Sequence, residues 1–139
     1  MYSIHNNKIT SEIKNGRGIL KEFNEYDGKL RFEGQFLYDQ KLKGKYYIDE
    51  ILEYEGEFLF NKKWNGKGYD IKGNKIYELS NGNGKVKEYG DLFGKLIFEG
   101  EYLNGKSNGK GKEFYSDGKL LYKGDYLNGM EKFMTKKII

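Results

Sequence analysis

The sequence contains no cysteine and no proline, and it has a single histidine, His5. Without cysteine the chain can form neither disulfides nor thiolate metal sites, so packing and backbone pairing must hold it together. One histidine cannot build a multi-histidine metal centre. His5 stands in a polar stretch and is expected at the surface or at a sheet edge. We therefore expect no cofactor and no metal.

The sequence also lacks long apolar runs, a secretory start and a block of one charge. No run approaches the 18 apolar residues of a membrane span, and MYSIHNNKIT has no signal-peptide pattern. A cytoplasmic location is the expectation. Arg17 and Arg31 are the only arginines, and the lysines alternate with 21 acidic residues to a net charge of +4. Such mixing favours a solvated sheet face over an anion-binding patch.

What the sequence does contain is a repeat. FEGEYLNG at Phe98 returns as YKGDYLNG at Tyr122, and the chain has 20 glycines, 13 tyrosines and 9 phenylalanines. An aromatic anchor, usually followed by x-Gly, recurs at positions 32, 54, 77, 98 and 122, with spacings of 22, 23, 21 and 24 residues. Glycine pairs and Asp-Gly-type dipeptides separate the anchors. Each unit is therefore predicted to form a strand, a turn, a second strand and a second turn. The 3.6-residue period of a helix is absent from the units.

Alternation within the strands supports this prediction. In LIFEGEYL, Leu96, Phe98, Gly100 and Tyr102 share one face, and the same phase applies to the strands around Phe32 and Tyr54, which places Leu52 beside Tyr54. A glycine between two aromatics leaves room for a ring from a neighbouring strand. The predicted fold is all-β: an elongated, twisted antiparallel sheet of stacked β-hairpin repeats of about 22–24 residues.

The chain forms one predicted domain, residues 1–139. Its repeats run approximately over 11–31 (partial), 32–53, 54–76, 77–97 (degenerate), 98–121 and 122–139 (partial, a cap). In the degenerate copy Leu79 replaces the anchor glycine, and Asn81-Gly82 predicts a tight turn and a local change in sheet curvature. The tail from Met130 to Ile139 is expected to close the sheet as a strand or short helix.

The segment FEGEYLNGKSNGKGKEFYSDGK resembles the MORN repeat, whose pattern is aromatic-Glu-Gly-Glu-aromatic, Asn-Gly-Lys, Gly-x-Gly and then Asp-Gly. The resemblance extends over Gly16 to Gly129. The sequence also looks like the variant of this repeat in short bacterial proteins, some of which are labelled antitoxins. The resemblance implies a sheet of stacked hairpins. It also implies a scaffold or recognition surface, with lipid contact suspected for the family.

No pattern predicts catalysis. The Gly-x-Gly pairs lack a following helix and the Gly-Lys-Ser/Thr ending of a phosphate loop, and no serine stands in a Gly-x-Ser-x-Gly elbow. Acid pairs such as Glu99 and Glu101 recur from copy to copy, which favours pairing with lysines on adjacent strands over an active site. The prediction is a protein that is not an enzyme.

The candidate interaction surface combines aromatics and lysines. Four aromatics share one repeat position and are either a stacking platform for single-stranded nucleic acid or the sheet's own buried stripe. Trp64 is unique and is either a local lid on the sheet or an interface anchor. The candidate residues are Trp64, Phe36, Phe58, Tyr102, Tyr126, Lys63 and Lys106.

A protein partner is the favoured function, because repeat sheets offer long faces for partners. The chain would act as an inhibitor, an immunity or antitoxin-type protein, or a scaffold, and a second copy of the chain is another partner to consider. Peripheral binding to acidic membrane lipids is the alternative. Nucleic-acid binding is the weaker one, since arginine is nearly absent.

Overall fold

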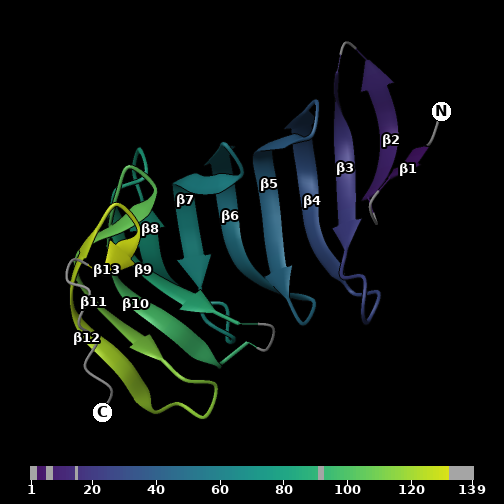
Figure 1. Cartoon of the computed structure of the whole chain (residues 1–139). Helices are drawn as coiled ribbons and strands as arrows, with labels where there is room; N and C mark the ends of the chain where they lie inside the picture. Colours follow the sequence, from purple (N-terminus) through teal and green to yellow (C-terminus); the bar gives the residue numbers. More distant parts are fainter. Residues whose placement is uncertain (1–2, 6–7, 15, 91–92, 132–139) are drawn as a thin grey trace.

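The computed structural model describes residues 3–5, 8–14, 16–90 and 93–131 (Figure 1), and every element within them is a β-strand. All strand pairs are antiparallel and join consecutive strands, so the all-β hairpin prediction is confirmed. The strands are β1 Ser3–His5, β2 Lys8–Lys14, β3 Arg17–Phe23, β4 Leu30–Leu37, β5 Gln40–Ile48, β6 Ile51–Leu59, β7 Lys62–Tyr69, β8 Lys75–Leu79, β9 Gly84–Tyr89, β10 Leu96–Leu103, β11 Lys106–Phe114, β12 Leu120–Leu127 and β13 Met130–Glu131.

The strands form two sheets rather than the single predicted one. β1 to β8 make the first sheet and β9 to β13 the second, with only the isolated bridge between Ser80 and Asn83 between β8 and β9. The division falls in the degenerate copy. Leu79 and Val86 take positions that glycines hold in neighbouring strands, and both side chains are buried in the core beside Tyr77.

Rows of glycine cross both sheets. Gly34, Gly44, Gly56 and Gly66 pair in register across β4 to β7, and Gly100, Gly111 and Gly124 pair across β10 to β12. A Cβ at Gly44 would lie 2.8 Å from the Phe32 ring of the adjacent strand, and one at Gly111 would lie 2.8 Å from the Tyr126 ring. Rings therefore lie against glycines of neighbouring strands, but not at the predicted glycines. Those that stand between two aromatics, at Gly56, Gly100 and Gly124, lie against the preceding aromatic of their own strand.

We call the face that carries these rings the inner face and the charged face the outer face. The buried apolar residues of the described chain are Leu20, Phe32, Phe36, Ile48, Tyr54, Phe58, Tyr77, Leu79, Val86, Phe98, Tyr122 and Tyr126. On the outer face acids and lysines oppose one another across strands: Lys45 pairs in register with Glu33 and Glu55, and Glu99 with Lys87 and Lys112. The predicted pairing of recurrent acids with lysines is confirmed.

A β-bulge before each anchor changes the strand alternation. Tyr46 pairs with Tyr54, but Tyr47 pairs with Leu52, so Glu53 is the extra residue. The Tyr47 hydroxyl donates to Glu33 on the outer face, at 2.7 Å. Leu52 therefore faces outward, and the prediction that it shares the face of Tyr54 was wrong. The bulge turns Glu53 inward instead.

Most of the tight hairpin turns lie along one edge of the sheets, the upper edge in Figure 1, which we call the turn edge. Positive φ values there, such as 50° at Asn81 and 77° at Gly82, are those of two-residue hairpin turns. The opposite edge, the loop edge, carries the longer connections and the two-residue turn Asp49-Glu50 between β5 and β6. β1, with His5, is the edge strand of the first sheet, and β13 contains the first residues of the tail; residues 132–139 lie outside the described residues.

Candidate functional site

Glu53 is the most buried charged residue of the described chain, with 1% of its surface exposed. Its Oε1 lies 2.5 Å from Lys63 Nζ, and its Oε2 accepts a hydrogen bond of 2.7 Å from the Tyr77 hydroxyl. Lys63 also donates to that hydroxyl at 3.1 Å. Both carboxylate oxygens thus have partners, as a buried charge requires.

Aromatic rings surround the Lys63 ammonium. Nζ lies 5.2 Å from the ring centroids of Tyr46 and Tyr54 and 5.7 Å from that of Tyr77, which are cation–π distances. Burial, followed by the charge of Glu53, raises the pKa of Tyr77, so its hydroxyl stays protonated and donates to Glu53. Lys63 is therefore engaged inside the molecule.

A cavity of about 340 Å³ lies inside the bend between the sheets. Its walls are formed by residues such as Tyr46, Phe58 and Leu79 of the first sheet and Val86 and Glu88 of the second. An adjoining groove of about 460 Å³ follows the inner face of the second sheet. The two hollows share Glu88, Tyr102 and Gly105, so they form one continuous concave surface.

Trp64 lies where the sheets meet at the turn edge. A Cβ at Gly82 would lie 2.6 Å from its ring, and one at Gly105 would lie 3.2 Å from it. The Gly82 N–H donates to the Trp64 carbonyl at 2.8 Å, and the Gly105 N–H donates to the Gly82 carbonyl at 2.9 Å. The ring therefore lies against the turn that joins the two sheets and against the β10–β11 turn beside it, a position that corresponds to the local-lid alternative for this residue.

Replacing Trp64 by alanine is expected to lower the free energy of unfolding by about 2 kcal/mol. The substitution removes a half-buried ring and, with it, the packing of that ring against Gly82 and Gly105. Chemical denaturation measures the loss. Tyr26→Ala is the control, since Tyr26 is fully solvated on the loop edge and its removal should cost no more than about 0.5 kcal/mol. Equal losses in the two variants would contradict a role for Trp64 at the junction.

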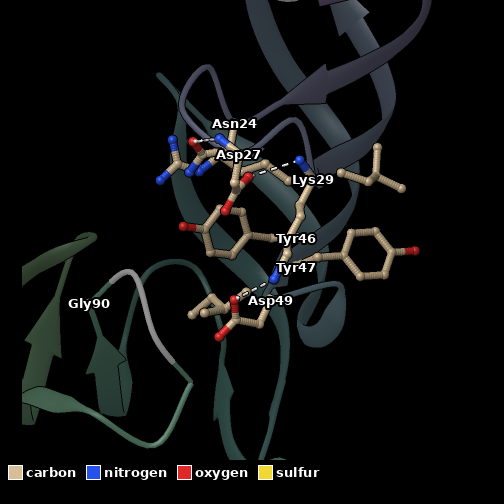
Figure 2. Close-up of a pocket in the computed structure, with 10 residues that line it drawn as sticks. Asn24, Asp27, Lys29, Tyr46, Tyr47, Asp49 and Gly90 are labelled. Atoms are coloured by element: carbon tan, nitrogen blue, oxygen red, sulfur yellow. Dashed lines mark hydrogen bonds and ion pairs between the residues drawn. The ribbon is translucent and has the colours of Figure 1, made fainter.

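The loop edge provides a second link between the sheets (Figure 2). Gly90 of the second sheet and residues of the β3–β4 and β5–β6 connections line one hollow of about 20 Å³. Lys29 Nζ lies 3.2 Å from Asp49 Oδ1, and the Lys29 N–H donates to Asp27 Oδ1 at 2.9 Å. A space of this size has room for a water molecule at most. We interpret it as a loop contact rather than a binding site.

The predicted site residues are distributed over different environments. Phe36, Phe58 and Tyr126 are buried and Tyr102 is half-buried, so these rings form the stripe of the inner face. Lys106 is exposed at the turn edge. The structure thus brings Phe58, Lys63 and Tyr102 together around the bend but does not collect the seven residues on one open surface.

An aligned row of exposed apolar side chains was not predicted. Phe60 is 71% exposed, and leucines at one shared position end β6, β10 and β12 on the outer side of the turn edge. Alternation already places Leu103 opposite Phe98 and Tyr102, and this signal could have found the leucines. We call the row the apolar edge; it consists of Tyr38, Leu59, Phe60, Leu103, Leu127 and Met130.

Glu53, Glu88 and Glu113 are the functional candidates that sequence reasoning missed. Their signal is weak, because each looks like one of many strand acids until the register places it on the inner face. Within the described residues no cluster of three or more histidine or acidic side chains is arranged to hold a metal. The described chain also has no helix with the length and apolarity needed to cross a membrane.

Comparison with known proteins gives no relative. No protein-family model matches the chain, and neither a curated protein nor a solved structure shows significant similarity to it. The surfaces of the molecule are therefore the basis for inferring its function.

Proposed function

We propose that the chain is a non-catalytic β-repeat module of the MORN type that binds a protein partner. In this role it acts as an inhibitor, as an immunity or antitoxin-type protein, or as a scaffold. The observation that carries the proposal is the apolar edge. The aromatic side chains of the inner face are already packed, yet Phe60 and Met130 remain about 70% exposed on the same edge as the three leucines.

The surroundings of the apolar edge suit an interface. Lys62 and Lys106 are exposed and begin the strands that follow Phe60 and Leu103. An apolar centre with a charged rim is typical of protein–protein interfaces, and aligned exposed apolar side chains mark binding surfaces in soluble proteins. The turns that carry these side chains are linked to neighbouring turns by backbone hydrogen bonds, such as Gly105 to Gly82. The row is therefore presented on a rigid frame.

Capture from the native source tests the proposal. The tagged chain should retain one polypeptide at low and at high salt, because apolar contacts are not screened by ions. The double variant Phe60→Ser/Leu103→Ser should reduce that capture at least about tenfold, since few residues supply most interface energy. Ile71→Ser/Tyr115→Ser is the matched control, because it removes two exposed apolar side chains from the loop edge.

Three results would contradict the proposal. The first is equal capture by the two double variants. The second is retention of anionic vesicles alone, lost in high salt, which would favour peripheral membrane binding. The third is retention of nucleic acid alone with a steep salt dependence. Recovery of the chain itself would identify a second copy as the partner.

A further inference from the structure

The groove on the inner face of the second sheet carries two carboxylates around one aromatic ring. Phe98 pairs in register with Glu88 of β9 and with Glu113 of β11, so both acids face the same side of the sheet. All three residues line the groove of about 460 Å³ together with Tyr102 and Tyr126. The two acids therefore flank a floor of aromatic rings.

The two carboxylates differ in their partners. Glu113 Oε1 accepts a hydrogen bond of 2.8 Å from the Tyr126 hydroxyl. Glu88 forms no hydrogen bond or ion pair with another described residue, although the charge of Lys63 acts on it from the adjoining cavity. Burial raises the pKa of Glu88, and the charges of Glu53 and Glu113 add to this effect. The charge of Lys63 lowers this pKa in part, but no described residue forms a hydrogen bond or ion pair with an ionised Glu88, so its burial remains costly.

Two described lysines near the groove are paired with other acids. Lys63 is paired with Glu53, and Lys41 lies 3.7 Å from Glu22. Among the described residues, Lys106 is the one lysine that lines this groove, at its exposed turn end. Two carboxylates thus face one rim lysine, in a molecule whose net charge is +4.

The molecule itself shows what such surroundings hold. Lys63 places its ammonium against one carboxylate and over the rings of Tyr46, Tyr54 and Tyr77. The groove combines the same kinds of group, with Glu88 and Glu113 as carboxylates, the half-buried Tyr102 as a ring at its surface and the buried Phe98 as its floor. Carboxylates combined with aromatic faces bind ammonium and guanidinium groups.

We propose that this groove takes a lysine or arginine side chain of the protein partner, seated between Glu88 and Glu113 over the rings of Phe98 and Tyr102. The inference depends on the proposed function, because it assigns the chemistry of the partner's anchoring residue. The apolar edge would provide contact area, and the groove would select a partner segment with a basic residue. Polyanions such as nucleic acids are disfavoured here, since the acids repel phosphate.

Titration with a hexalysine peptide tests the groove on the full chain. Calorimetry at pH 7 should detect binding, and a hexamer of Nε-acetyl-lysine should bind at least about tenfold more weakly because it lacks the charge. The variant Glu88→Gln/Glu113→Gln should weaken hexalysine binding at least about tenfold. The control Glu55→Gln/Glu99→Gln makes the same charge change on the outer face and should alter binding less than about twofold.

A fold check accompanies the titration. Glu88→Gln removes a charge that is costly to bury, so its melting temperature should equal or exceed that of the unchanged protein. Loss of hexalysine binding without loss of stability is the result expected of a binding residue. Equal effects of the two double variants, or equal binding of the two peptides, would overturn the inference.

The capture experiment separates this inference from the proposed function. A partner retained by the unchanged chain, lost by Phe60→Ser/Leu103→Ser and fully kept by Glu88→Gln/Glu113→Gln would overturn the groove while the proposed function stands. Absence of any protein in the capture would overturn the proposed function, and with it the partner's basic side chain as the occupant. The hexalysine titration would then report only the groove's chemistry.

Discussion

Alanine at Gly44 is expected to lower the free energy of unfolding by about 3 kcal/mol, the upper range for an overpacked core. The new Cβ would lie 2.8 Å from both the Phe32 ring and the Gly34 Cα, with the Glu33 carbonyl closer still. Phe32 is fully buried and has no free space to enter. The backbone of β4 and β5 would have to separate, and their register hydrogen bonds would weaken.

Urea denaturation of Gly44→Ala beside Gly90→Ala measures this effect. Among the described residues, a Cβ at Gly90 would meet only Ile97, at an ordinary 3.6 Å. Gly90→Ala should therefore leave the free energy of unfolding unchanged or raise it by up to about 0.5 kcal/mol, because alanine lowers the conformational entropy of the unfolded chain. If the Gly44 variant unfolded at the same urea concentration as the Gly90 variant, the glycine rows would not be required for close approach of the strands.

Replacing Lys63 by methionine is expected to cost about 3 kcal/mol. Methionine keeps most of the side-chain volume but leaves the carboxylate of Glu53, with 1% of its side chain exposed, without its cation. Breaking a buried ion pair from one side is costly because a charge stays uncompensated. The Tyr77 hydroxyl would be the remaining partner of Glu53.

The double variant Glu53→Gln/Lys63→Met identifies the cause. Because it removes both charges and keeps an acceptor for Tyr77, it should recover stability to within about 1 kcal/mol of the unchanged protein. Lys41→Met is the matched single variant, since Lys41 faces Phe36 as Lys63 faces Phe58 and its ion pair is longer, at 3.7 Å. A loss near 1 kcal/mol is expected there. A double variant no more stable than Lys63→Met would show that packing, not charge, sets the cost.

The repeat predicted much of the fold, because turn chemistry and strand alternation are local properties. The spacing of the aromatic anchors predicted the hairpins. Which glycines receive a ring from a neighbouring strand was not predicted, because it depends on how the side chains pack across strands. The division into two sheets was not predicted. It depends on how Leu79 and Val86 pack against Tyr77, which is a contact between different copies of the repeat.

The candidate site was predicted less well, for a related reason. Alternation assigns Glu53 to the outer face, and only the bulge opposite Tyr46 and Tyr47 turns it inward. A bulge changes side-chain direction without a marked change in composition. Phe58 and Tyr102 were predicted as either a stacking platform or a buried stripe and Lys63 as a candidate interaction residue, and their meeting around one cavity at the bend was not predicted.

The position of the bend has a consequence for how such a chain can lengthen. Strands contact mainly the strands next to them in sequence, and only the copy around Tyr77 interrupts the pairing. Duplication of a complete unit, such as residues 98–121, would extend one arm and leave the corner and its contacts at Trp64 unchanged. The number of copies on each side would therefore set the two arm lengths independently, so gene duplication could alter reach without redesign of the corner.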